Sequence, residues 1–494
     1  MRKVTRRAAL FGAGGLAGWA AAGLFRPDLP TYAGTKPIVA PRGQTILNDA
    51  SGLSATPVHS HLQFAQSDQT LVDAVRLEMA EARSAGRPLN VGAARHSMGG
   101  QAIPRQGTAI SFRNGAIEID SDNQIYRAHA GARWSDAIAA LDPLGWSPKV
   151  MQSNNDFGLA ATYSVNAHGW PVPFGPMGST VRSLRMVLPS GELVICSPHE
   201  NAELFNLGMG GYGLVGVIID MDVEMVKNTR LLPSYAVMDT ADFAANFRQA
   251  VNDPEVTMAY GRLNVERETF FEHALLVTYR EAEDQQELPA ADGSGWMAHA
   301  ASRIYRAQLG NEALKTFRWW NETRLGPALG GGPTTRNSLL NEPVVTLDDH
   351  DPQRTDILHE YFVGFDAFDR FVDACREVIP ASYQEFLNVT LRYVAQDDQS
   401  VLSFAPVPRI AAVMSFSQEL TERAEADQAR MTRNLIDRVV DLGGAYYLPY
   451  RPHATVDQLT RSYPRAAEFA QAKRELDPGL LLRNNLWDQY LGQL

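Results

Sequence analysis

The sequence predicts a mixed helix-and-strand protein of two domains, and three observations support this class. Its 494 residues are enough for several domains of about 150 residues, or for fewer large α/β domains. Up to about residue 228, short strands are separated by turns and interrupted by three glycine-rich loops. Beyond that point, longer helical segments alternate with strands. We therefore place a domain boundary near residue 228.

Composition excludes several function classes. Lys and Arg total 45 against 56 Asp and Glu, for a net charge of −11, whereas binding to nucleic-acid phosphates requires a dense basic face. The chain is 45% hydrophobic and 20% charged, which is typical of neither disordered nor fibrous proteins. Cys196 and Cys375 are its two cysteines. They can form one bridge at most, and they exclude a disulfide scaffold, a Cys-rich zinc site and a cysteine-ligated iron–sulfur cluster.

The N-terminus has the layout of an export signal. Arg2, Lys3, Arg6 and Arg7 precede an uncharged run over residues 8–25. The string around Arg6-Arg7 resembles bacterial twin-arginine signals, which send folded, cofactor-loaded proteins across the inner membrane. A retained anchor and an ordinary amphipathic helix are the alternatives. We expect residues 1–26 to be a twin-arginine signal peptide or anchor, no later membrane span, and a periplasmic or periplasm-facing protein that is soluble and acidic.

Hydrophobic periodicity sets the elements of the first domain. Apolar residues recur at helical spacing over residues 70–85, and a second short helix is expected at 134–141. An extended lead-in is expected at 27–52, a loop of small residues at 157–169 and a helical turn at 201–205. Strands are expected at 88–92, 108–112, 117–119, 125–130, 181–188, 193–196 and 217–226.

The second domain is less regular in its patterns. Helical segments are expected at 356–378 and 418–441, and strands at 386–394 and 410–416. The Gly/Pro-rich stretch 326–335 is expected to form a loop. The tail, 455–494, is expected to be helical and to return to the first domain.

The three glycine-rich loops indicate a ligand site. They span residues 91–102, 160–169 and 208–216. Small residues let backbone amides approach a ligand, and successive amides can cradle phosphate oxygens. The third loop follows a helical turn and opens a strand, which is the reverse of the dinucleotide fingerprint, so a nicotinamide cofactor is not expected. Loops spread over roughly 125 residues indicate one large, extended ligand.

The loops also resemble those of a known family. The string from Arg95 to Gln101 resembles the flavin-linking loop of vanillyl-alcohol oxidase-type (PCMH-type) FAD-dependent oxidoreductases, and closely that of cytokinin dehydrogenases. Residues 164–169, the hairpin 181–196 and residues 201–216 are similar in the same order. The tail from Tyr463 to Asn484 resembles the close of aldonolactone and alditol oxidases.

This resemblance implies an α+β fold with a defined organisation. Residues 45–227 would form a PCMH-type FAD-binding domain of two α/β subdomains. Residues 228–454 would form a substrate (cap) domain of antiparallel sheet and helices, and residues 455–494 would return to the FAD-binding domain.

The resemblance also implies FAD as cofactor, bonded covalently from His96 to the 8-methyl carbon of the flavin. Relatives with a second link use a cysteine in the loop that corresponds to 157–169, and this chain has none there, so a single link is expected. No metal ligands are predicted. The predicted cofactor-binding residues are Gly92, Ala93, Ala94, Arg95, His96, Ser97, Met98, Gly99, Gly100, Gln101, Ser164, Asn166, His168, Gly169, Gly213, Gly216, Val217 and Asn484.

The catalytic residues are expected in the cap. A hydride leaves a substrate carbon for flavin N5 while a base accepts the proton of the hydroxyl or amine. Asn388 and Arg392 lie four apart on one expected strand, so both side chains point to one face. For each candidate, an ordinary interdomain hydrogen bond is the alternative. The candidates are Tyr450, Arg451, Glu360, Tyr361, Asn388 and Arg392, with Tyr450 first as the base and Tyr447 beside it.

The predicted function is oxidation of a CH–OH group of a sugar, polyol or related alcohol by an exported FAD-dependent oxidase or dehydrogenase. Aldonolactone oxidases carry a His-Trp-Gly-Lys-like string where this chain has 447–451, a departure that argues against lactones. The alternatives are amine (CH–NH) or C–C oxidation and a non-catalytic binding protein with a flavin fold. Oxygen, a quinone or a periplasmic carrier could accept the electrons.

Overall fold

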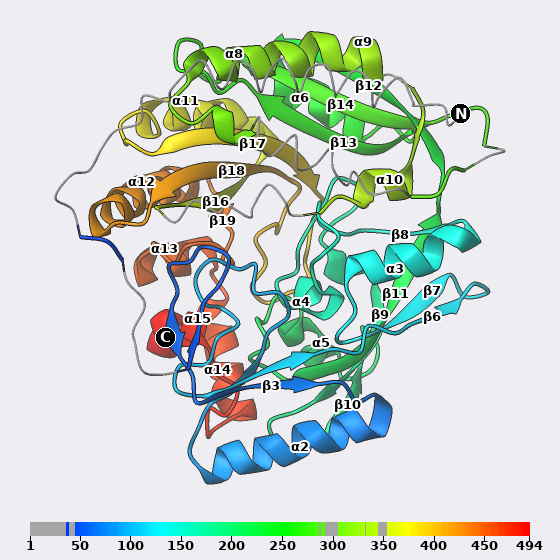
Figure 1. Ribbon diagram of the computed structural model, residues 1–494, viewed down its shortest axis with the longest axis vertical. Helices are drawn as coiled ribbons and strands as arrows, with labels where there is room; N and C mark the ends of the chain where they lie inside the picture. Colours follow the sequence, from blue (N-terminus) through cyan, green and yellow to red (C-terminus); the bar gives the residue numbers. More distant parts are fainter. Residues whose placement is uncertain (1–35, 39–44, 286–287, 292–304, 331, 344–352) are drawn as a thin grey trace.

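A computed structural model describes residues 36–38, 45–285, 288–291, 305–330, 332–343 and 353–494 (Figure 1). The expected signal segment, 1–26, lies outside the described residues. The described chain forms a small parallel sheet, a six-stranded sheet, an eight-stranded sheet and a two-stranded ribbon of β1 (Ile46–Leu47) and β2 (Thr56–Pro57). Figure 1 shows the eight-stranded sheet in the upper part and the other sheets below it.

The small sheet is parallel, in the order β3-β5-β4. Helix α2 connects β3 to β4 and buries Leu71, Val72, Val75 and Met79, the stripe that its periodicity predicts. The C-terminal segment extends this sheet, because Leu482 bridges Leu89 of β4 in parallel. The elements are β3 (Ser60–Phe64), α2 (Asp68–Ser84), β4 (Leu89–Val91) and β5 (Thr108–Phe112).

The six-stranded sheet runs β10-β9-β11-β7-β6, with β8 also paired to the long strand β11. All of its pairings are antiparallel. The expected loop at 157–169 is partly wrong, because α4 begins at Leu159. The elements are β6 (Ile117–Asp120), β7 (Ile125–His129), α3 (Trp134–Leu141), η1 (Asp142–Leu144), β8 (Trp146–Pro148), α4 (Leu159–Ser164), η2 (Met177–Thr180), β9 (Val181–Val187), β10 (Leu193–Cys196), α5 (Ala202–Gly208) and β11 (Val217–Lys227).

The eight-stranded sheet is antiparallel, in the order β15-β12-β14-β13-β17-β18-β16-β19. The helix expected over 356–378 is wrong in its first half. Residues 354–363 are strand β16, a run rich in aromatic and β-branched residues that is buried on both faces, and periodicity alone does not distinguish such a run from a helix. The strands are β12 (Arg230–Asp239), β13 (Val256–Leu263), β14 (His273–Glu281), β15 (Thr334–Thr335), β16 (Arg354–Val363), β17 (Glu385–Val394), β18 (Arg409–Glu419) and β19 (Ala445–Tyr446).

The two faces of this sheet differ in chemistry. Tyr361 on one face packs against Phe371 of α11, and His359 bonds to Thr432 of α12. On the other face, α8 reaches the strands with Arg318. The loop expected at 326–335 is also wrong, since α9 and β15 begin within it. The helices are α6 (Thr240–Val251), α8 (Glu312–Trp320), η3 (Asn321–Leu325), α9 (Gly326–Gly330), α10 (Arg336–Leu340), η4 (Phe365–Ala367), α11 (Phe368–Val378), α12 (Glu422–Asp441), α13 (Val456–Ser462), α14 (Ala466–Leu476), α15 (Asn485–Gln489) and η5 (Leu491–Gln493).

Both cysteines are buried, and neither forms a bridge. Within the part of the chain that the structure describes, no helix has both the length and the apolar character needed to cross a bilayer.

Candidate functional site

A cavity of about 330 Å³ lies where the glycine-rich loops meet the eight-stranded sheet. This volume falls within the usual range for small-molecule sites, about 300–1,000 Å³. Loop 92–97, the segment 158–168 and residues 212–218 line one part. Strands β16, β17 and β18 line another, together with residues 447–450. The cavity therefore brings together segments that lie more than 300 residues apart in the sequence.

Loop 92–97 presents free backbone amides to this cavity. The N–H groups of residues 93–97 donate no hydrogen bond to any described residue. Arg95 has a φ of 55°, in the left-handed region, so the peptide units around it change direction within the loop. Successive amides in such a conformation form a concave binding site for anions. The loop can therefore hold a diphosphate through its backbone.

The next residues of the loop fix its position; among them Gln101 also lines the cavity, whereas Met98, Gly99 and Gly100 do not. Met98 N donates to Pro449 O at 2.7 Å, and Gln101 Nε2 donates to Leu448 O at 2.7 Å and to Tyr450 O at 2.9 Å. A Cβ on Gly99 would lie 2.8 Å from Pro452, and one on Gly100, which has a φ of 70°, 2.2 Å from Asn485. Met98, Gly99 and Gly100 were predicted to bind the cofactor. They instead lie on the side of the loop away from the cavity and hold the loop in place.

His96 lies on the cavity wall. Its Nε2 is 3.5 Å from Asp156 Oδ2, and its ring centroid is 4.3 Å from that of Phe157. Its side chain is 19% exposed, so the imidazole is accessible from the cavity while its orientation is held by these two neighbours.

In the other two glycine-rich loops, too, some of the predicted residues line the cavity and others hold the loops in place. Ser164, His168, Gly213, Gly216 and Val217 line the cavity. The remaining predicted residues lie behind it. Asn166 bonds Asp397 and Gly178 N, Gly169 packs against the Met151 carbonyl, and Asn484 Nδ2 donates to Tyr212 O at 2.9 Å.

A buried polar group occupies the sheet side of the cavity. Glu360 of β16 is 3% exposed, and its Oε1 lies 2.5 Å from Nε2 of His168. Tyr450 also hydrogen-bonds Glu360. Burial, and then the charge of Glu360, raise the pKa of Tyr450 well above its usual value. Tyr450 therefore remains a phenol and a hydrogen-bond donor, and Glu360 is the stronger candidate base.

Arg392 of β17 also lines this side of the cavity. Its Nε is buried and forms no hydrogen bond to a described residue. Burial lowers its pKa, while the charge of Glu360 opposes that effect. Arg392 is thus a cationic donor available to a ligand.

Two of the predicted catalytic residues lie elsewhere. Tyr361 is 1% exposed and points to the opposite face of β16 from Glu360, against Phe371, because neighbouring strand residues alternate between faces. Asn388 shares a face with Arg392, as the spacing predicts, but its Oδ1 accepts from Arg262 at 2.6 Å and from Arg318 at 2.8 Å. Neither residue lines the cavity.

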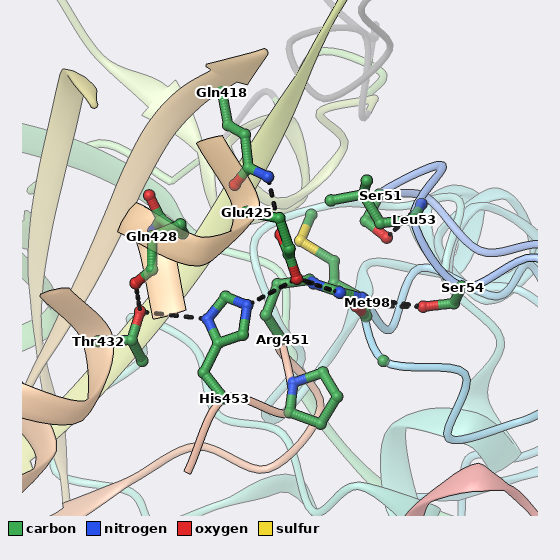
Figure 2. Close-up of polar contacts among 12 residues, drawn as sticks. Ser51, Leu53, Ser54, Met98, Gln418, Glu425, Gln428, Thr432, Arg451 and His453 are labelled. Carbon is green, nitrogen blue, oxygen red and sulfur yellow. Dashed lines mark hydrogen bonds and ion pairs between the residues drawn. The ribbon is translucent and has the colours of Figure 1, made fainter. Parts of the chain in front are cut away.

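Arg451 also lies outside the cavity, which corrects the expectation that it faces the flavin. Figure 2 shows its guanidinium joining helix α12 to the glycine-rich loop: Nη1 donates to Met98 O at 3.0 Å and to Ser54 Oγ at 3.1 Å, and Nη2 pairs with Glu425. His453 Nε2 lies 2.8 Å from the same Glu425 oxygen. Arg451 therefore positions the loop.

Glu425 is expected to make stability depend on acid pH. Burial alone would raise its pKa, but the hydrogen bond from His453 and the charge of Arg451 outweigh burial and hold the pKa well below its usual range. A depressed pKa adds stability above the unfolded value of about 4.3, and this contribution is lost as the pH falls below it. Glu425→Ala should cost about 3–5 kcal/mol by leaving Arg451 unpaired.

Denaturant unfolding at pH 7 measures that cost. A thermal melt of Glu425→Gln at pH 3 and 6 provides the second test, because this variant should lose less stability on acidification than the unmodified chain. An equal loss in both proteins would contradict this role of Glu425.

Sequence reasoning missed three polar residues at the β3–β5 side of the cavity, His61, Ser111 and Arg113, although it predicted their neighbour Arg95. His61 Nε2 is 3.1 Å from Ser111 Oγ, and Arg95 Nη2 lies 3.3 Å from both. Arg113 also lines this part. His61 and Ser111 come from two short strands without a motif, and only the parallel pairing of β3 with β5, which aligns His61 with Ala109, brings them to one edge. Among the described residues, no cluster of three or more acidic, His or Cys side chains could hold a metal ion.

The site fits an FAD in its free amides, its small-residue wall and its unpaired polar atoms. Besides Arg392 Nε, the buried atoms without a partner among the described residues include Arg95 Nε and His168 Nδ1. Residues 67–197 match the FAD binding domain family. Residues 67–197 are thus an FAD-binding domain by this match, and the relatives named below support the predicted resemblance to PCMH-type FAD-linked oxidoreductases.

Individual relatives resemble parts of the chain. L-galactono-1,4-lactone dehydrogenase of Brassica oleracea is 23% identical over 42% of this chain and 34% of its own length. A putative D-arabinono-1,4-lactone oxidase of Neurospora crassa is 27% identical over 25% of this chain and 22% of its own. Cytokinin dehydrogenase 1 of Arabidopsis thaliana is 32% identical over 28% of this chain and 26% of its own. The chain thus spans about a third or less of the length of these relatives.

Proposed function

We propose that the protein is an FAD-dependent oxidoreductase that oxidises a CH–OH group of a sugar, a polyol or a related alcohol. The observation that carries this proposal is the group Glu360, His168 and Tyr450, which lies in the same cavity as the amides of residues 93–97. A carboxylate held by two hydrogen bonds is suited to accept the proton of a hydroxyl. The lactone-oxidising names among the relatives also support a sugar-derived substrate.

Each residue has a distinct part in the proposed reaction. The amides of residues 93–97 would hold the FAD diphosphate, and the flavin, when bound, accepts the hydride. Glu360 takes the hydroxyl proton onto its carboxylate. The hydrogen bonds from His168 and Tyr450 orient that carboxylate, and Arg392 binds a substrate oxygen. The cavity walls limit access of water to these groups.

We propose that FAD is attached covalently through His96. Support comes from the position of His96 on the cavity wall and from the resemblance of loop 95–101 to flavin-linking loops. The loop at 157–169 contains no cysteine that could form a second link.

Amine oxidation is the second candidate, because the match to cytokinin dehydrogenase 1 reaches 32% identity. A substrate panel distinguishes the two. The purified protein is mixed without oxygen with polyols, sugars and amines, and the flavin absorption near 450 nm is followed. Bleaching by an alcohol supports the proposal, and bleaching by amines alone favours the second candidate. A yellow protein that none of these compounds reduces would indicate a binding protein, and a colourless one would contradict the assignment.

We propose export by the twin-arginine route, with delivery to the periplasm, because Arg6 and Arg7 precede an uncharged run. Replacing both with Lys should leave the protein in the cytoplasm. Cell fractionation with immunoblotting measures this result, and Arg2→Lys with Lys3→Arg serves as the control that keeps the charge. Normal export of the double-Lys protein would refute the route.

A further inference from the structure

The face of the eight-stranded sheet that meets the cavity carries charged side chains among apolar ones. Glu360, Val413 and Arg392, which lie on three adjacent strands of this face, line the cavity. Arg262 of β13 pairs with Thr390 on the same face, and its guanidinium donates to Asn388. This face therefore carries one carboxylate and two guanidiniums near the substrate side of the cavity.

Strand register separates Glu360 from Arg392. Glu360 pairs with Val413, and Arg392 pairs with Ala411, so β18 lies between the two charged residues. Two strand spacings of about 4.8 Å and an offset of two residues along β18, at about 3.3 Å each, separate their backbones by about 12 Å. The intervening residues, Ala411 and Val413, are small. A substrate can therefore lie across β18 with one end at Glu360 and the other at Arg392.

Arg392 lacks a counter-ion. No ion pair joins it to a carboxylate among the described residues, and its Nε has no hydrogen-bond partner there. Glu360 is close enough to affect its pKa, but the Glu360 carboxylate is bonded to His168 and Tyr450. Arg262 adds a second positive charge, which disfavours the charged form of Arg392. A desolvated cation in this setting is costly unless an anion binds to it.

We infer that the substrate carries a carboxylate, which Arg392 binds, while the hydroxyl to be oxidised lies at Glu360. The substrate class is thus a hydroxy-carboxylate such as a sugar acid, held by a guanidinium that can bind a carboxylate through two hydrogen bonds. This inference rests on the proposed oxidoreductase function and narrows its substrate.

The first test compares two compounds that differ at one carbon. D-Gluconate and D-glucitol share a carbon chain, and only the former carries a carboxylate. The flavin of the holoenzyme should be reduced by gluconate with a kcat/KM at least about tenfold above that for glucitol. Rising salt concentration should lower the kcat/KM for gluconate and leave that for glucitol unchanged. Arg392→Gln should lower the gluconate value by about 100-fold, the scale for losing one partner of a buried charge pair, and Arg392→Lys should restore part of it.

A binding measurement makes the test independent of turnover. Oxalate has no C–H hydride to give, and its binding can be titrated by calorimetry against neutral oxamide. Oxalate should bind the unmodified protein and Arg438→Gln, a surface variant, but not Arg392→Gln. Arg438 is half-exposed and pairs with Glu377, away from the cavity.

The outcomes separate the two proposals. Equal use of gluconate and glucitol, with no selective oxalate binding, would overturn the carboxylate site and leave the oxidoreductase intact. Oxalate binding to a holoenzyme that no alcohol reduces would support the carboxylate site and contradict the alcohol-oxidising function. If Arg392→Gln does not fold, two measurements on the unmodified protein decide whether the carboxylate site exists. They are the ratio of the kcat/KM for gluconate to that for glucitol and the salt dependence of the kcat/KM for gluconate.

Discussion

Glu360→Gln is expected to slow anaerobic flavin reduction by about a hundred- to ten-thousand-fold, the range for loss of a general base. The amide keeps the size of the side chain and can still bond to His168 and Tyr450, but it cannot accept the substrate proton. Stopped-flow absorption measures the rate, and the FAD content should be unchanged because Glu360 lies on the sheet side of the cavity.

Tyr450→Phe is the matched variant for this experiment. It removes one hydrogen bond to Glu360 and leaves the carboxylate, so its effect should be the smaller of the two. The reverse order of effects would make the phenol the base and would contradict the argument from its raised pKa.

His96→Ala is expected to convert attached FAD to dissociable FAD. In acid-denatured unmodified protein, the yellow colour should stay with the precipitate, whereas the variant should release its flavin to the supernatant. Absorption spectra of both fractions measure the change, and Asp156→Asn, which alters a neighbour of His96 but leaves its imidazole, is the control. Release of flavin from the unmodified protein would refute the covalent bond and leave FAD binding standing.

Sequence reasoning reached the fold through local signals. The stripe that includes Leu71, Val75 and Met79 predicted α2, and the long apolar run from Val217 predicted β11. It failed at β16, where side chains are buried on both faces and neither a period of two nor a helical period emerges. Burial on both faces is a property of the assembled sheet, so no local pattern reports it.

The candidate site shows the same limit. Loop 92–97 was recognisable because its small residues and His96 form a local string. In the cap, the chemical type of Glu360 and Arg392 was predictable, but their placement was not. Tyr361 and Glu360 are neighbours in sequence, so their side chains point to opposite faces of β16. Only the packing of Tyr361 against α11 shows that Glu360 is the one that faces the cavity. Arg451 looked catalytic beside Tyr450, yet it turns to Glu425 because α12 packs there.

The bridge between Leu482 and Leu89 bears on how the molecule is made. Until Leu482 has been synthesised, the outer edge of β4 has no partner from the tail, and the bond from Asn484 to Tyr212 O cannot form. The FAD-binding domain therefore cannot complete its packing before residues 482–484 have been made, however early its own residues emerge. A nascent or truncated product that lacks these residues would expose an open strand edge of the kind that leads to aggregation.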